Sequence, residues 1–473
     1  MDFVIFLSHS PFAVEFFVLY TIGMESRIEF TNAELKRLIV PLIIEQALAV
    51  SVGIADTMMV SAVGEAAVSG VSLVDMISVI LIQVFAALST GGAVVASQFI
   101  GSKQYDKARL SANQLLLVTF LISVVIMILS LTMRSQMLRL LFGSIDDAVM
   151  KGSMIYFGIT ALSFPFLSLY NAGAALFRAM GNSRVSMFAS LITNIINIAG
   201  NAICIYGLHM GVEGVAIPTL ISRAVGALIL LALLRDPRRI VHIMPRNFKP
   251  DFGIIRKILF IGIPSGLENS VFQLGRVMVT SIIALFGTMQ IAATAVAHNM
   301  GAFGNLPGQA VSLAMITVVG HCIGAQDFEG AKYYTRKLMK ITYVLTAAIN
   351  LFIIVSLPLL LRIYNLSEET LRYAAILVII HSGCAILLWP VSFTLPNSLR
   401  AANDVRYTMV VSIASMWVFR VFSSYILGLQ MGWGAIGVWI SMILDWICRS
   451  SFFVIRFRSR KWLTKYKPSN NKI

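Results

Sequence analysis

Apolar runs long enough to cross a lipid bilayer recur along this chain of 473 residues. A helix of about 20 apolar residues spans the hydrocarbon core of a membrane. Strands of a membrane barrel would alternate apolar and polar residues, and these runs do not. Charged residues make up 12% of the sequence, against about 25% in soluble domains. The sequence therefore predicts an all-α polytopic membrane protein.

The apolar runs predict twelve transmembrane helices in two lobes of six. The first six helices are expected near residues 36–60, 70–99, 109–132, 152–177, 185–206 and 213–234. The other six are expected near 255–285, 292–322, 336–361, 371–398, 407–428 and 434–456. The predicted divisions of the chain are an N-terminal extension and cytoplasmic lead-in (1–34), a first lobe (35–234), a basic cytoplasmic linker (235–253), a second lobe (254–458) and a basic cytoplasmic tail (459–473).

Residues 1–23 fit this scheme poorly. They are mostly apolar, but they lack the basic start of a signal peptide and are interrupted by polar residues at 8–10 and a proline at 11. We expect a dispensable extension or an over-called start. The alternative is an additional interfacial or membrane helix.

The positive charge of the chain is explained by its loops. The net charge is +15, and Lys and Arg concentrate in alternate loops such as 101–109 and 235–253, whereas 286–291 and 429–433 contain neither. Cytoplasmic loops of membrane proteins have this excess. We therefore expect a location in the plasma membrane, both termini in the cytoplasm, and no nucleic-acid partner.

An internal repeat relates the two predicted lobes. An offset of 223 residues pairs Pro41 with Pro264 and Gly64 with Gly287, and it pairs the loop IGSKQYDKAR with IGAQDFEGAK. Because six is an even number of crossings, both lobes enter the membrane from the same side. The axis that relates them is then expected along the membrane normal, and two such lobes around a midplane cavity are typical of transporters.

Two carboxylates, Glu45 and Asp56, interrupt the first predicted helix. They are eleven residues apart, so both lie on one stripe of a helix, about 16 Å from each other. A carboxylate at this depth costs at least ~2.5–3.5 kcal/mol to insert and usually faces a cavity. At the 223-residue offset Glu45 matches Glu268, whereas Asp56 matches Val279. We expect functional roles for both acids; a structural role is the alternative for either.

Further polar residues lie in the matching helices. Arg276 follows Glu268 by eight residues, and a buried arginine needs an anion or water. Its candidate partners are Glu268 and the two acids of the first helix, and a static ion pair with Glu268 is the simpler alternative. Asp75 and His298 match each other at the 223-residue offset. They are expected near the outer mouth of a cavity, or else as hydrated helix-end residues.

Three amides, Asn194, Asn197 and Asn201, share one face of the fifth predicted helix. In lipid such amides need partners, so this face should turn toward the bundle. They either hold neighbouring helices together or act jointly with Asp56.

The sequence contains no constellation typical of an enzyme. The four cysteines and six histidines show no spacing typical of a metal site or a redox pair, and no nucleophile–base cluster is evident. We therefore expect no catalytic activity, no metal and no cofactor beyond a coupling ion, H⁺ or Na⁺. The expected partners are a small organic substrate and the lipid bilayer, and the expected state is a monomer.

Several segments resemble the multidrug and toxic compound extrusion (MATE) transporters. They are GIADTMMVSAVGEAAVSGVSLV, IGSKQYDKAR, NIINIAGNAICIYGLHMGVEGVAIPT and WISMILDWICRSSFFVIRFRSRKW, and the resemblance covers residues 35–462. It implies a V-shaped pair of six-helix lobes. It also implies export of organic, typically cationic compounds by alternating access, coupled to entry of a cation.

The resemblance further implies a cation-coupling site. Asp56 falls on the family's first-helix acid, Asn197 and Asn201 on its fifth-helix polar pair, and Thr219 on a sixth-helix hydroxyl. Many members carry Asp where this chain has Asn201, which leaves Asp56 as the main titratable group. The remaining candidates are assigned to the cavity and its substrate: Glu45, Asp75, Glu268, Arg276 and His298.

Two departures bear on the coupling ion. The glutamate of the sodium-coupled branch would fall near Phe272, one turn after Glu268, and residues 371–398 contain no acid where that branch has one. We therefore expect proton rather than sodium coupling. The alternative function is a flippase for lipid-linked oligosaccharides, which is expected to line its cavity with several bases. The sequence indicates only two membrane-embedded bases, Arg276 and Arg420.

Overall fold

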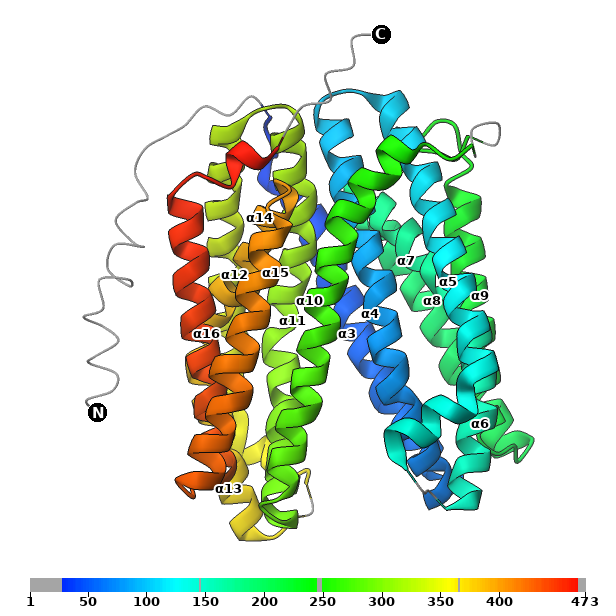
Figure 1. The fold of residues 1–473 in the computed structure, drawn as a ribbon, viewed down its shortest axis with the longest axis vertical. Helices are drawn as coiled ribbons and strands as arrows, with labels where there is room; N and C mark the ends of the chain where they lie inside the picture. Colours follow the sequence, from blue (N-terminus) through cyan, green and yellow to red (C-terminus); the bar gives the residue numbers. More distant parts are fainter. Residues whose placement is uncertain (1–27, 144–145, 245–248, 365, 467–473) are drawn as a thin grey trace.

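The computed structural model describes residues 28–143, 146–244, 249–364 and 366–466. These residues form helices and no strands (Figure 1). The all-α prediction is therefore confirmed for the described part of the chain, and helical structure occupies all twelve predicted spans. The expectations for residues 1–23 lie outside the described residues.

The first lobe contains seven α-helices because one predicted span is broken in two. Its helices are α3 (Asn32–Ser61), α4 (Glu65–Gly101), α5 (Tyr105–Phe142), α6 (Asp147–Leu162), α7 (Phe164–Ala179), α8 (Ser183–Ala202), the π-helical turn η1 (Ile203–Gly207) and α9 (Glu213–Leu233). A capping box between Thr31 and Glu34 starts α3. Helices α6 and α7 form one span bent by 44°, and Pro165 at the start of α7 supplies no backbone donor to the preceding turn.

The second lobe repeats this order. Its helices are α10 (Phe252–Ala284), α11 (Thr288–Gly324), α12 (Phe328–Leu361), α13 (Glu368–Trp389), α14 (Leu395–Ala401), α15 (Val405–Ser415) and α16 (Gly434–Arg458). Shorter turns join or follow them: η2 (Pro390–Thr394), η3 (Met416–Phe422), η4 (Tyr425–Gln430) and η5 (Leu463–Lys465). Helix α13, η2 and α14 make one span, and α15, η3 and η4 make the next.

Most of these elements are apolar enough to cross a membrane. Within the described residues, ten helices pass a test of length and composition, and the bent pair α6 and α7 is an eleventh candidate. Helix α10 is not among them, although it has 33 residues. Its apolar run is interrupted by Glu268, Asn269, Gln273 and Arg276. The chain is therefore a multi-pass membrane protein in which α10 is the most polar of the long helices.

The internal repeat extends to the backbone conformation. Lys103 (φ 58°) and Gln326 (φ 59°) both have positive φ and stand 223 residues apart. Gly181 (φ 76°) and Asn403 (φ 67°) form a second such pair. Non-glycine residues rarely adopt this conformation. The two lobes therefore end their second and fourth spans with the same turns, as the paired loop sequences predict.

The lobes meet through α3 and α4 on one side and α10 and α11 on the other. A Cβ atom on Gly91 would lie 2.5 Å from the carbonyl oxygen of Ile258, and one on Gly101 would lie 2.0 Å from that of His321. Backbones therefore touch at the end where α16 leaves the bundle (Figure 1). At the opposite end the bundles diverge, and the apolar side chains of Met58 and Met278 are 67% and 42% exposed.

Candidate functional site

The structure brings together the four residues predicted for cation coupling. Asp56 Oδ1 on α3 accepts a hydrogen bond of 2.6 Å from Asn201 Nδ2 on α8. Asn197, one turn earlier on α8, donates from Nδ2 to Thr219 Oγ1 on α9 at 3.0 Å. Asn197 and Asn201 also lie within 3.5 Å of each other. Three helices of the first lobe thus contribute to one polar cluster, and Asp56 keeps partial exposure.

Asp75 joins this cluster from α4. Its Oδ1 accepts a hydrogen bond of 3.3 Å from the hydroxyl of Tyr156 on α6. Arg223 on α9 donates to Ser163 Oγ at 2.6 Å and lies close enough to interact electrostatically with both Asp56 and Asp75. We call the following residues the first-lobe cluster: Asp56, Asp75, Tyr156, Asn197, Asn201, Thr219 and Arg223.

Sequence reasoning missed Arg223 and Tyr156. Arg223 is a single base within the apolar run IPTLISRAVGALILL, and a base at that depth requires a polar neighbour. That signal was available in the sequence. Tyr156 could not be found in the same way, because tyrosine is common at membrane boundaries and its partner depends on how α6 is rotated.

Glu45 and Glu268 each form an ion pair that is repeated between the lobes. Glu45 lies 3.1 Å from Arg178 and also accepts a hydrogen bond of 2.7 Å from Ser186. Glu268 lies 2.7 Å from Arg400. All four side chains are at most 14% exposed. The two acids are therefore neutralised near the end of the bundle where the lobes touch.

The expected ion pair of Arg276 needs correction. Glu268 binds Arg400 instead, and the one hydrogen bond found for Arg276 among the described residues is to Gln273 Oε1 at 3.3 Å. The reason is geometric, since eight residues place Arg276 about 80° around the helix from Glu268. Arg400 closes the matching pair because it ends the tenth span, as Arg178 ends the fourth.

Arg276 and His298 line a cavity of about 640 Å³ in the second lobe, which we call the second-lobe cavity. It is bounded by α10, α11, α13, η2, α14, η3 and α16, and Gln46 and Gln83 of the first lobe close one side. Its basic lining residues are Arg276, Arg400, Arg420, Arg449, His298 and His381.

One further acid lies behind this wall. Asp445 on α16 is fully buried, pairs with Arg449 at 2.9 Å and lies 3.9 Å from Arg420. The sequence contains both residues in the run DWICR, where a spacing of four places them on one helix face. The prediction of only two membrane-embedded bases is therefore wrong, because Arg223, Arg400 and Arg449 are added to Arg276 and Arg420.

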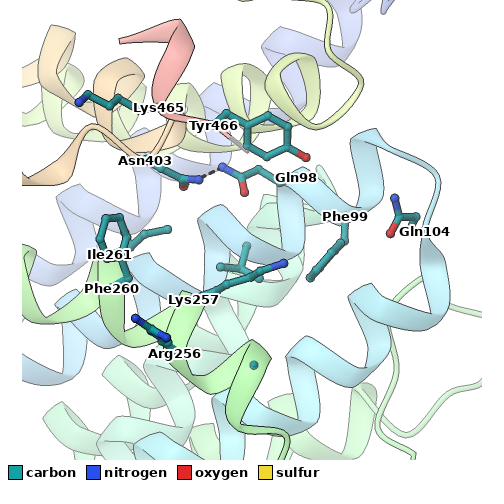
Figure 2. Close-up of a pocket in the computed structure, with 12 residues that line it drawn as sticks. Gln98, Phe99, Gln104, Arg256, Lys257, Phe260, Ile261, Asn403, Lys465 and Tyr466 are labelled. Atoms are coloured by element: carbon teal, nitrogen blue, oxygen red, sulfur yellow. Dashed lines mark hydrogen bonds between the residues drawn. The ribbon is translucent and has the colours of Figure 1, made fainter. Parts of the chain in front are cut away.

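A smaller pocket of about 390 Å³ lies between the lobes at their closed end. Figure 2 shows Gln98 of α4 facing Asn403, which lies in the turn between α14 and α15, and Arg256 and Lys257 of α10 below them. Gln98 Nε2 donates to Asn403 Oδ1 at 3.0 Å and to the carbonyl oxygen of Ala401 at 2.8 Å. These contacts join the two lobes on the side predicted to face the cytoplasm.

Known proteins of similar sequence are transporters. The chain is 29% identical over 433 residues to "Uncharacterized transporter YisQ" of Bacillus subtilis (strain 168), covering 90% of this chain and 94% of that protein. It is 26% identical over 434 residues to "Probable multidrug resistance protein NorM" of Thermotoga maritima, covering 91% and 92%.

Solved structures of similar fold have TM-scores above 0.8. A structure described as the "outward-facing conformation of a multidrug resistance MATE family transporter of the MOP superfamily" gives 0.86, at 22% identity and 92% and 96% coverage. A second, from Pyrococcus furiosus, gives 0.84 at the same identity and coverage. Its title reads "reverse polarity of binding pocket suggests different function of a MOP superfamily transporter".

The family model described as MatE matches twice, at residues 41–203 and 264–426. The two matches begin 223 residues apart, which is the offset of the internal repeat. Together they cover more than half of the chain. The chain therefore belongs to the MatE family of multidrug and toxic compound extrusion (MATE) proteins, which are efflux transporters and not enzymes.

Proposed function

We propose that this transporter exports small organic compounds in exchange for a cation that binds at the first-lobe cluster, and that the cation is a proton rather than sodium. The observation that carries the proposal is the contact between Asp56 and Asn201. It joins an acid without a counterpart in the other lobe to an amide of a different helix. Asp56 is partly exposed on the side where the lobes diverge, so an ion from that side can reach it.

The coupling step follows from the chemistry of this contact. The ionised carboxylate of Asp56 accepts the Asn201 amide hydrogen bond, and protonation removes its charge. A neutral carboxyl group costs less to bury in a membrane than a charged one. Protonation therefore lets α3 and α8 close around Asp56 while the lobes reopen on the opposite side. Release of the proton there restores the outward-open arrangement.

The available driving force depends on the charge of the substrate. One pH unit supplies about 1.4 kcal/mol, and 100 mV supplies about 2.3 kcal/mol for each net charge moved. Exchange of one proton for one monovalent cation moves no net charge, so only the pH difference drives it. Accumulation of such a cation is then limited to roughly tenfold per pH unit.

The expectation of a cationic substrate is supported by Asp56 and Asp75, which would attract a cation to the outer cleft. The charge of the second-lobe cavity points to the opposite sign. The same bases also favour a second candidate function, a flippase for lipid-linked oligosaccharides, because five arginines now lie within the lobes where the sequence indicated two. Transport of a lipid-linked oligosaccharide but of no soluble compound would select this second function.

The remaining parts of the proposal concern location and assembly. We place the protein in the plasma membrane as a monomer, with both termini in the cytoplasm. The alternation of Lys and Arg between loops supports this orientation. The closed end of the lobes would then face the cytoplasm.

The ion assignment is tested in proteoliposomes loaded with a fluorescent organic dye. The experiment imposes a pH gradient in sodium-free buffer, and then a sodium gradient at equal pH. We expect dye movement with the first gradient and none with the second. Transport that requires sodium and ignores the pH gradient would reverse the assignment.

A further inference from the structure

The second-lobe cavity has more positive than negative charge. Four arginines line it, and they face two carboxylates, Glu268 and Asp445. Glu268 is taken up by Arg400, and Asp445 by Arg449 with Arg420 nearby. Two positive charges therefore remain in surplus, and Arg276 contacts only the neutral Gln273 among the described residues. A cation entering this cavity would meet net repulsion.

Three buried nitrogen atoms of the lining have no hydrogen-bond partner within the described structure. They are Arg420 Nε, Trp446 Nε1 and His381 Nδ1. Their residues are 7%, 2% and 5% exposed. Buried donors of this kind normally bind an acceptor, and the nitrogens of arginine and tryptophan can only donate. The cavity therefore presents unused donors to whatever occupies it.

Flat aromatic side chains form the rest of the wall. Trp389 stacks on Phe393 with ring centroids 5.2 Å apart. The guanidinium group of Arg449 lies 5.0 Å from the ring of Phe272 and 5.2 Å from that of Phe393. Alternating guanidinium and aromatic faces are suited to a flat, conjugated ring with an acidic substituent, since the ring stacks while the charge accepts hydrogen bonds.

The repeat shows how the two lobes diverge in charge. At the 223-residue offset, Asp56 corresponds to Val279 and Asp75 to His298, so both carboxylates of the first-lobe cluster are lost. At the same offset Asn197 corresponds to Arg420, so a neutral amide is replaced by a base. The place that holds acids in one lobe holds bases in the other.

We propose that the second-lobe cavity binds an organic anion with a flat aromatic ring, such as an aromatic carboxylate, as the exported substrate. Arg276 and Arg420 contact the anionic group, and Phe272, Trp389 and Phe393 contact the ring. This inference rests on the proposed export function and names the substrate class that the function leaves open. It replaces the expectation of a cationic substrate for this lobe.

The charge of the substrate changes how transport responds to membrane potential. Export of one monovalent anion with entry of one proton moves two positive charges inward. An inside-negative potential of 100 mV would then increase the achievable gradient about 50-fold for each charge moved. Proton exchange for a monovalent cation would not respond to potential.

The binding test uses the purified full chain in detergent and isothermal titration calorimetry. The probe is 2-naphthoate, and its neutral isostere 2-naphthamide and the cation N-methylquinolinium serve as comparison ligands. We expect 2-naphthoate to bind at least about tenfold more tightly than either, because only the carboxylate forms charge-assisted hydrogen bonds. Equal affinity for the amide, or preference for the cation, would overturn the proposal without any variant.

Substitutions then locate the site. Arg276→Gln removes a base that is in no ion pair among the described residues, so it leaves no carboxylate unpaired; we expect a loss of about tenfold in 2-naphthoate affinity and no change for 2-naphthamide. Arg372→Gln, an exposed arginine at the start of α13, is the matched control and should bind as the parent does. If Arg276→Gln and Arg372→Gln bind 2-naphthoate equally, the cavity is not the site.

Two further comparisons separate this inference from others. Asp56→Asn should bind 2-naphthoate within about threefold of the parent, even if it no longer couples transport to protons, because the two sites lie in different lobes. Failure of proton-driven transport with intact 2-naphthoate selectivity would therefore affect only the proposed function. Displacement of 2-naphthoate by micromolar phosphatidylglycerol, but not by soluble aromatic acids, would assign the cavity to a lipid headgroup and contradict the proposal.

Discussion

At the scale of single residues, the buried ion pair between Glu45 and Arg178 offers the clearest stability test. Breaking such a pair leaves one charge buried without its partner, which costs about 3–5 kcal/mol. Glu45→Ala should therefore lower the melting temperature more than the double variant Glu45→Ala with Arg178→Ala, which removes both charges. Thermal unfolding of the purified variants measures this. A double variant less stable than the single one would mean that Arg178 has other essential partners.

The milder change Glu45→Gln should slow transport without abolishing it. The amide still accepts hydrogen bonds from Arg178 and Ser186, and the acid lies nearer the closed end than Asp56. Initial rates of dye efflux from proteoliposomes, compared with those of Glu268→Gln as the matched change in the second lobe, test the expectation. Complete loss of transport with normal folding would place Glu45 in the coupling step itself.

The site could be predicted from sequence where residues signal their own need for a partner. Asp56, Asn197 and Asn201 are polar residues at helical spacing inside apolar runs, and they do lie together. The partners of Arg276 and Glu268 could not be predicted, because they depend on the rotation of several helices. Arg400 and Arg449 were missed since both stand close to helix ends, where a base is ordinary.

At the scale of helices, the contact between α4 and α11 depends on glycine. A Cβ atom on Gly101 would lie 2.0 Å from the carbonyl oxygen of His321, and one on Gly324 would lie 1.9 Å from that of Gln98. Gly101→Ala should therefore force the two backbones apart and destabilise the protein by about 1–3 kcal/mol. Gly383 on α13 is the control, since no atom lies within 4 Å of its would-be Cβ.

We expect Gly383→Ala to be neutral or slightly stabilising, because alanine favours a helix by up to about 1 kcal/mol over glycine. Differential scanning fluorimetry of both variants measures the contrast. Equal melting temperatures would mean that α4 and α11 can separate without cost, and the lobe contact would then not depend on these glycines.

Helices were predictable as elements but not in their irregularities. Long apolar runs predict all twelve spans, because length and hydropathy are properties of one segment. The predicted ends fall short of the observed ones, as for α4 and α5, since these helices continue past the apolar run into polar turns. The π-helical turns at η2 and η3 have no local signal, because they depend on packing against α16 and α10.

At the scale of the whole molecule, closure of one end and divergence of the other predict a specific cross-link. Gln98 reaches Ala401 across the lobes, so cysteines at these two positions should react with a short bifunctional thiol reagent. The background would have the four native cysteines replaced by serine. Cross-linked protein should hold the closed end shut and stop transport, and cleavage of the link should restore it.

Each single-cysteine variant treated with the same reagent is the control and should keep transporting. If the cross-linked protein transports at the rate of the untreated one, transport does not require the closed end to open. Alternating access between these two lobes would then be excluded.

The predicted orientation is tested with the same cysteine-free background. A cysteine at Lys103 or Lys465 should react with a membrane-impermeant reagent only from the cytoplasmic side, and one at Glu65 or Thr288 only from outside. These positions lie at opposite ends of the long helices. Labelling of Lys465→Cys from outside intact cells would invert the orientation that the loop charges predict.

The most direct test of proton-coupled export is the response of Asp56→Asn to an imposed pH gradient. The variant keeps the size of the side chain and removes the titration, so it should insert and fold as the parent does. In proteoliposomes containing ethidium or fluorescein, whichever the parent transports, we expect the parent to move the dye against its gradient and Asp56→Asn to leave it unmoved. Folded Asp56→Asn protein that pumps dye at the parental rate would contradict the assignment of Asp56 as the coupling residue.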